Sequence, residues 1–88
     1  MKFTVVWLPA AEAELTEIWM ACEQRNLVSA AAGEIDRLLG DAPFEVGESR
    51  DGTTRVLISA PLVVTYQASE ADRIVWVASV RLHQKRRR

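Results

Sequence analysis

The sequence predicts an α+β fold in which a two-helix hairpin packs on a twisted antiparallel sheet, in the order β-α-α-β-β-β. Apolar residues recur at helical spacing over residues 9–24, and again over residues 26–40. Three runs rich in β-branched residues follow over residues 54–80, with short turns between them. At 88 residues the chain has room for one small core, so residues 1–88 are expected to form a single domain.

The N-terminal segment is expected to form a strand and then an amphipathic helix. FTVVWL, residues 3–8, is rich in the β-branched and aromatic residues that favour strands. Pro9 suits the first position of a helix, because its missing N–H needs no partner there. One face of the helix over residues 9–24 then collects the apolar residues Ala11, Leu15, Ile18, Trp19 and Cys22.

A second helix is expected from Asn26, a suitable N-cap, to Gly40, a suitable stop. The link between the helices is so short that they should lie antiparallel as a hairpin. DAPFEVGESRDGT, residues 41–53, carries proline and glycines and is interpreted as a loop.

The C-terminal half is expected to supply three strands, over residues 54–60, 62–68 and 74–80. Short turns make neighbouring strands antiparallel. Both faces of IVWVASV, residues 74–80, are largely apolar, which predicts a central strand.

Charge divides the chain, although the formal net charge is only −1. Residues 1–48 hold three basic and nine acidic residues, whereas residues 49–88 hold eight basic and three acidic ones. This asymmetry indicates either a basic working face or two halves that neutralise one another.

Composition limits the location and the chemistry. The single cysteine, Cys22, excludes an internal disulfide and a cysteine-rich metal site, so the cytoplasm is the expected location. The N-terminus has no signal-peptide pattern, and no apolar stretch approaches the ~20 residues that cross a bilayer. No glycine-rich phosphate loop, metal-ligand pair or Ser/His/Asp set occurs, so no cofactor or metal is expected.

Arg55 is the first candidate for a functional side chain. It shares a strand face with Leu57, so a charge projects from an otherwise apolar face. It could hold a phosphate or a partner carboxylate, or it could be an edge arginine that extends to water. The functional role is preferred.

The C-terminal stretch SVRLHQKRRR supplies the other candidates. His83, the only histidine, has a pKa suited to acid–base work, and Arg81 could stabilise a charged transition state. A lone terminal histidine is more often a surface residue. The basic run Lys85, Arg86, Arg87 and Arg88 is expected to attract phosphates or an acidic partner.

Aromatic residues and the cysteine are assigned structural roles. Trp7, Trp19 and Trp76 are expected in the core between helices and sheet, with base stacking by a tryptophan as the alternative. Tyr66 is expected to be a buried ring with a hydrogen-bonded hydroxyl, and Cys22 to lie in the core.

The whole pattern resembles the RelE/ParE superfamily of type II toxin–antitoxin toxins, also called plasmid stabilisation proteins. The resemblance lies in FTVVWLPAAEAEL, in IDRLL followed by Pro43, in TRVL, in PLVVTYQASEADRIVWVASV and in the closing LHQKRR. It implies a toxin that a cognate antitoxin neutralises. RelE-like members cut mRNA on the ribosome with several bases and an acid–base group, whereas ParE-like members are associated with binding and poisoning DNA gyrase.

Carried over by position, Arg55 matches the first base of the second strand of such toxins, and His83 matches the acid–base position after the fourth. The second base falls at Leu57, the third-strand arginine falls at Val63, and no tyrosine follows His83. The ending L-H-x-x-R resembles ParE-like members. The resemblance therefore favours a toxin that binds its target over an mRNA endonuclease.

The expected contacts with the target or the antitoxin are Arg55, Arg81, His83, Lys85, Arg86 and Arg87, with His83 and Arg55 as the catalytic pair if the chain is an endonuclease. A degenerate toxin that only binds its antitoxin is a third alternative. A homodimer or a toxin–antitoxin hetero-oligomer is possible, and no membrane partner is expected.

Overall fold

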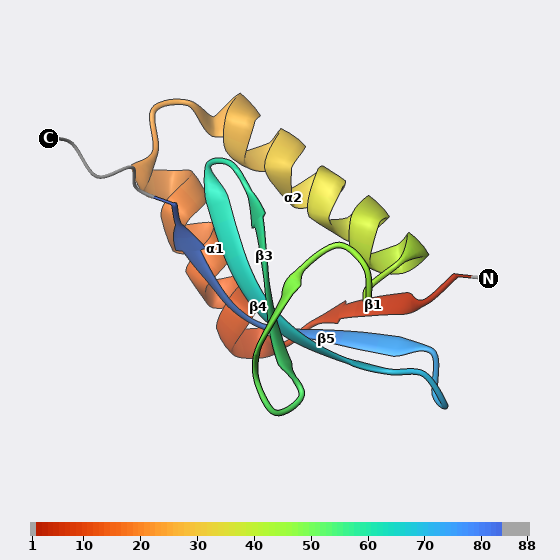
Figure 1. Ribbon diagram of the computed structural model, residues 1–88. Coiled ribbons are helices and arrows are strands. Elements are labelled where there is room, and N and C mark those ends of the chain that lie inside the picture. Colours follow the sequence, from red (N-terminus) through yellow and green to blue (C-terminus); the bar gives the residue numbers. More distant parts are fainter. Residues whose placement is uncertain (1, 84–88) are drawn as a thin grey trace, which may run out of the picture.

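The computed structural model describes residues 2–83. Within that range the helices and strands follow in this order (Figure 1): β1 (Thr4–Trp7), α1 (Pro9–Ala21), α2 (Arg25–Asp41), β2 (Glu48–Asp51), β3 (Thr54–Ser59), β4 (Leu62–Ser69) and β5 (Ile74–Leu82). The N-cap of the second helix lies two residues earlier than predicted, because the helix begins at Arg25 and includes Asn26. Gln24 holds that position without a side-chain hydrogen bond.

The strands form one sheet in the order β1-β5-β4-β3-β2. Strands β3, β4 and β5 pair antiparallel and β5 lies inside the sheet, as expected, and β2 also pairs antiparallel with β3. The expected all-antiparallel sheet is corrected at its edge, because β1 pairs parallel with β5, from Thr4↔Ile74 to Trp7↔Val77. The intervening helices and strands provide the long connection that parallel pairing needs.

Strand β2 is a second departure from the expected order, because it lies inside the predicted loop 41–53. Its four residues, ESRD, are all exposed and polar, so no apolar alternation marks them as a strand. Gly52 adopts a φ of 58° in the turn after β2, a conformation that glycine takes at little cost. The turn brings β2 against β3 and gives the sheet its outer edge.

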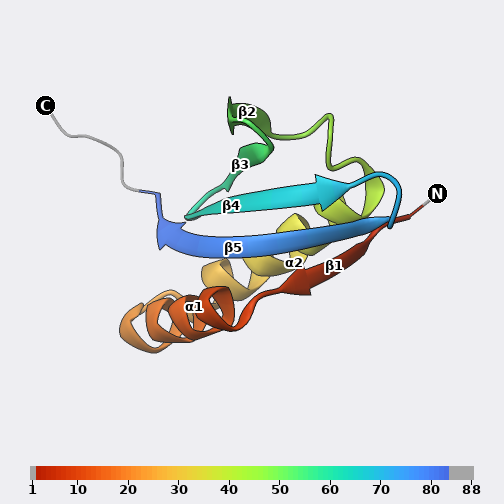
Figure 2. The same cartoon turned by 90° about the horizontal axis from the view of Figure 1, so that it is seen from below.

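Both helices cover the same face of the sheet (Figure 2). The core lies between the two helices and the sheet and contains mainly aliphatic side chains. Tyr66 has the largest of the fully buried side chains. The core comprises Ala11, Val28, Ala31, Ile35, Leu39, Leu57, Leu62, Val64, Tyr66, Val75, Val77 and Val80.

The opposite face of the sheet carries no helix within residues 2–83, and we call it the open face (Figure 2). Strand alternation and pairing register assign its side chains. They are Thr4 and Val6 on β1, Ile74, Trp76, Ser79 and Arg81 on β5, Val63, Thr65, Gln67 and Ser69 on β4, Thr54, Val56 and Ile58 on β3, and Glu48 and Asp51 on β2.

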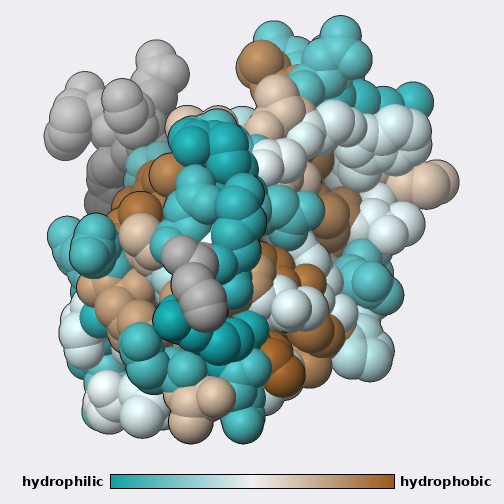
Figure 3. Space-filling view, turned by 90° about the vertical axis from the view of Figure 1, so that its right-hand side faces the viewer, coloured by the Kyte–Doolittle hydropathy of each residue, from teal (hydrophilic) through white to brown (hydrophobic). Residues whose placement is uncertain are grey.

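The end of the molecule seen in Figure 3 is largely hydrophilic, with small hydrophobic areas between the polar residues. Among residues 2–83, no helix has the length and apolar character needed to span a bilayer.

Candidate functional site

The structure places Arg55 and Arg81 on opposite faces of the sheet. Arg55 pairs with Tyr66 and projects on the helix side, together with Leu57, as its position in the sequence predicted. Arg81 pairs with Val63 and projects from the open face. Their positions also differ by three residues along β4, or about 10 Å. The two arginines therefore do not form one site.

Arg55 binds its own chain. Its Nε donates a hydrogen bond to the hydroxyl of Tyr66 at 3.3 Å. Its Nη2 donates to the carbonyl oxygens of Phe44 at 3.1 Å and Gly47 at 2.9 Å. The hydroxyl of Tyr66 in turn donates to the carbonyl oxygen of Pro43 at 2.6 Å. The half-buried guanidinium and the buried phenol thus hold the segment between α2 and β2 against the sheet.

Gly47 makes this contact possible because the segment approaches the sheet so closely. A Cβ atom on Gly47 would lie 2.6 Å from both the Tyr66 hydroxyl and the Val56 carbonyl oxygen. Only a residue without a side chain fits there unless the backbone moves.

Arg81 lies next to apolar side chains. Its neighbours across the open face are Val63 on β4 and Ile58 on β3, because the register pairs Ile58 with Val63 and Val63 with Arg81. The positions where RelE-like toxins have further bases, Leu57 and Val63, are thus divided between the two faces. Arg81 forms no ion pair with a carboxylate in residues 2–83.

A β-bulge sets the direction of Arg81. The pairing shifts between Thr65↔Ser79 and Tyr66↔Val77, which leaves one extra residue, Ala78, on β5. Beyond the bulge, Val80 faces the core and Arg81 faces outward. Without the extra residue, the side chains of β5 beyond the bulge would exchange faces, because a shift of one residue moves every side chain of a strand to the other face of the sheet.

Glu14 supports β5 beyond the end of β1, a role that no sequence pattern predicted. Its Oε1 accepts the backbone N–H of Val80 at 2.8 Å, from a half-buried position on α1. Strand β1 stops at Trp7, so it offers no partner to this part of β5. A helical carboxylate replaces the missing strand, and only the three-dimensional packing reveals it.

His83 directly follows β5 and is exposed. Its backbone N–H donates to the carbonyl oxygen of Pro61 at 2.7 Å, which fixes its main chain beside the β3–β4 turn. Lys85, Arg86, Arg87 and Arg88 lie outside the described residues.

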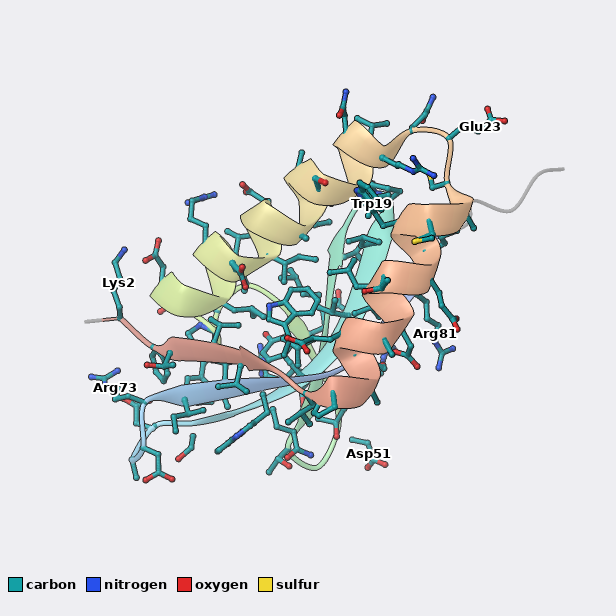
Figure 4. All side chains as sticks on the ribbon, turned by 180° about the vertical axis from the view of Figure 1, so that it is seen from behind. Lys2, Trp19, Glu23, Asp51, Arg73 and Arg81 are labelled. Carbon is teal, nitrogen blue, oxygen red and sulfur yellow. The ribbon has the colours of Figure 1, made fainter. Side chains whose placement is uncertain are left out.

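Figure 4 shows Arg73 and Arg81 far apart, at the two ends of β5.

Two of the three tryptophans differ from their expected core positions. Trp7 packs against the core and donates its indole N–H to Asp36 Oδ1 at 2.7 Å. Trp19 is 39% exposed because it points toward α2 instead of the sheet (Figure 4), and it donates to Ser29 Oγ at 3.1 Å. Trp76 lies half-buried on the open face.

The guanidinium of Arg25 closes the helix hairpin. It lies 4.8 Å from the ring centroid of Trp19 and donates to the carbonyl oxygens of Trp19 and Met20, at the end of α1. Cys22 is half-buried, at the margin of the core rather than inside it. Tyr66 has the buried ring and bonded hydroxyl that the sequence predicted.

Within residues 2–83, no three His, Cys, Asp or Glu side chains are grouped so that they could hold a metal ion. The pKa shifts lie on the exposed side of α2, where the hydrogen bond from Arg37 lowers the pKa of Glu34 and the same bond raises that of Arg37. These groups lie on a helix, away from Arg81.

The chain is similar in structure to several known toxin proteins. A chain of the toxin–antitoxin complex RelBE2 from Mycobacterium tuberculosis covers 93% of this chain and 99% of its own length, with a TM-score of 0.76 and 17% identity. The chain has the fold of the RelE/ParE toxins.

Two further structures agree with that assignment. A chain of the chromosomal ParDE system of P. aeruginosa covers 93% of this chain and 97% of its own, with a TM-score of 0.69 and 14% identity. The isolated RelE toxin of E. coli covers 96% and 87%, with a TM-score of 0.64 and 15% identity. No protein-family model and no curated protein sequence matches this chain.

Proposed function

We propose that this chain is the toxin of a type II toxin–antitoxin module, acting in the cytoplasm and neutralised by a cognate antitoxin. The observation that carries the proposal is a fold shared over nearly the whole chain with proteins from the RelBE2 and ParDE toxin–antitoxin systems. The sequence resemblance to the RelE/ParE superfamily points the same way, since it includes the helix hairpin, the last strand and the basic C-terminal sequence.

We further propose that the toxin acts by binding a target such as DNA gyrase. Cleavage in the RelE manner, as the resemblance implies it, needs several bases and an acid–base group together. On the described part of the open face, Arg81 instead has Val63 and Ile58 beside it, while Arg55 lies on the other side of the sheet. That separation supports binding rather than cleavage.

The proposed contacts with the target or with an acidic antitoxin segment are Arg81, His83 and the basic run Lys85, Arg86 and Arg87. Arg55 contributes indirectly in this proposal. Two of its hydrogen bonds, to the carbonyl oxygens of Phe44 and Gly47, hold the segment that leads into β2. A direct contact by Arg55 remains a testable alternative.

The experiment is inducible expression in a bacterial host, with growth measured after induction. The wild-type chain should stop growth, and co-expression of the protein encoded by the adjacent reading frame should restore it. Arg81→Ala should weaken the arrest, whereas Arg50→Ala, which removes an exposed arginine from the edge strand, serves as the matched control. His83→Gln should change little.

Three results would contradict parts of this proposal. Growth without arrest, at a confirmed protein level, would favour a degenerate toxin that only binds its antitoxin. Loss of arrest in His83→Gln alone, with the fold and antitoxin binding intact, would favour the endonuclease. Equal arrest by the wild type and Arg81→Ala would remove Arg81 from the contact surface.

A further inference from the structure

The open face carries an apolar area that no element within residues 2–83 covers. Ile58 is 52% exposed, and Val56 on β3 and Val63 on β4 are half-buried beside it. Val6, which is 37% exposed, and the half-buried Trp76 form a second apolar pair four residues farther along β4, or about 13 Å away. Hydrophobic side chains gathered on one surface usually mark an interaction site.

Charged side chains of both signs border this area. Glu48 lies on the edge strand β2, and Arg81 lies on β5, three strand spacings away, or about 14 Å. Neither side chain forms an ion pair with another residue in 2–83. A face with an acid toward one side and a base toward the other is complementary to a second copy of itself related by a twofold axis.

We propose that two copies of this chain associate through their open faces about a twofold axis, so that Arg81 of each copy meets Glu48 of the other. An axis parallel to the strands, between β3 and β4, exchanges these two strands and also exchanges β2 with β5. Ile58 then faces Val63 of the partner subunit.

The strand register supports the polar contact as well. In the antiparallel ladder, Glu48 pairs with Val56, which pairs with Thr65, which pairs with Ser79. The same twofold axis therefore places Glu48 opposite Ser79 of the partner subunit. Arg81 is two residues beyond Ser79, about 7 Å, which an arginine side chain spans readily.

Charge favours a second copy over a nucleic acid as the occupant. The described strand residues of the open face carry two acids, Glu48 and Asp51, and one base, Arg81, whereas phosphate backbones are bound by surfaces with an excess of lysine and arginine. The face is also small, so the dimer should be weak, with a dissociation constant in the micromolar range. The proposal does not depend on the proposed toxin function.

Analytical ultracentrifugation of the full chain, from about 1 to 300 µM, tests the apolar part of the interface. The wild type should show a concentration-dependent dimer, and Ile58→Ser should raise the dissociation constant at least about tenfold. Leu27→Ser is the matched control, because Leu27 is also 52% exposed but lies on α2. A wild-type monomer at every concentration, or an effect of Leu27→Ser equal to that of Ile58→Ser, would overturn the proposal.

A charge exchange tests the polar part. Arg81→Glu and Glu48→Arg should each raise the dissociation constant about tenfold, because each places like charges together twice in the dimer. The double variant should return it to near the wild-type value. A double variant that dimerises as weakly as either single variant, with circular dichroism unchanged, would contradict the proposed pairing.

Glu48→Arg also separates this inference from the proposed function. Arg81 is kept in that variant, so growth arrest should persist while the dimer is lost. Arrest that disappears with the dimer would show that the dimer itself is needed, and arrest that persists would place target binding in the monomer. In both cases the dissociation constant still decides whether the open face is the interface.

Discussion

Arg55 and Tyr66 show at the residue scale how a structural role can resemble a functional one. A charged residue on an apolar strand was interpreted as a ligand for phosphate or carboxylate. The structure instead directs its guanidinium to the carbonyl oxygens of Phe44 and Gly47, with the Tyr66 hydroxyl beside them. Strand alternation predicted the face correctly, but the sequence could not show that a distant loop would fill it.

Tyr66→Phe is expected to destabilise the fold by about 1–3 kcal/mol, because the Pro43 carbonyl oxygen loses its donor in a buried site. Urea unfolding measures the change. Thr16→Val, which removes an exposed hydroxyl from α1, is the control and should stay within about 0.5 kcal/mol. An equal effect in both variants would mean that the buried hydrogen bond contributes nothing specific.

Arg55→Lys separates the structural role of Arg55 from a target contact. Lysine keeps the charge but cannot donate to two carbonyl oxygens and a hydroxyl in the same fork geometry. The free energy of unfolding should therefore fall by about 1–3 kcal/mol, while the folded protein inhibits its target as the wild type does. Unchanged stability with lost inhibition would instead make Arg55 a direct contact.

At the scale of elements, β5 depends on support from both sides. The N-terminal part of β5 pairs with β1 on one side and with β4 on the other. Strand β1 ends at Trp7, opposite Val77, and beyond that point Glu14 of α1 accepts the backbone N–H of Val80 instead. The sequence indicated that β5 is central and that its faces are apolar. It did not indicate the bulge at Ala78, because a bulge depends on the pairing register and leaves no simple pattern in one strand.

Glu14→Ala should destabilise the chain by about 1–3 kcal/mol and speed hydrogen exchange at the Val80 amide, since that N–H loses its acceptor. Glu14→Gln keeps an acceptor oxygen at the same place and should behave much more like the wild type. Amide exchange followed by NMR distinguishes them. If Val80 exchanges equally slowly in both variants, water or another group satisfies the N–H.

On α2, the Glu34–Arg37 pair should make the stability of the fold depend slightly on pH. The hydrogen bond from Arg37 lowers the pKa of Glu34, so the pair stabilises the fold above the ordinary pKa of a glutamate and is lost as the pH falls through the lowered value. Thermal unfolding should show the wild type slightly more stable than Glu34→Gln at pH 7 and equal to it near pH 2. A difference that persists at the lower pH would contradict the ionic origin.

At the scale of the whole molecule, the order of helices and strands was predictable because hydrophobic periodicity and turn residues carry it. The edge strand β2 was missed because its residues are polar, and the parallel pairing of β1 was missed because strand neighbours are decided by packing. Trp76 was assigned to the core because it is apolar. Its half-buried position on the open face follows from the sheet having helices on one side only.

The candidate site was predictable only in part, for the same physical reason. Sequence position identified Arg81 and His83 as residues at the end of the last strand, and the structure places them there. It also grouped Arg55 with them, but a sheet has two faces, and the register puts Arg55 on the other one. The basic run after His83 lies outside the described residues and stays a prediction.

A supercoiling assay with purified DNA gyrase and increasing amounts of the chain, performed beside an mRNA cleavage assay on translating ribosomes, tests whether the chain acts by binding gyrase. We expect inhibition of supercoiling by the wild type, weaker inhibition by Arg81→Ala, full inhibition by Arg50→Ala, and intact mRNA in every sample. Cleaved mRNA with the wild type but not with His83→Gln, together with unaffected supercoiling, would contradict that expectation.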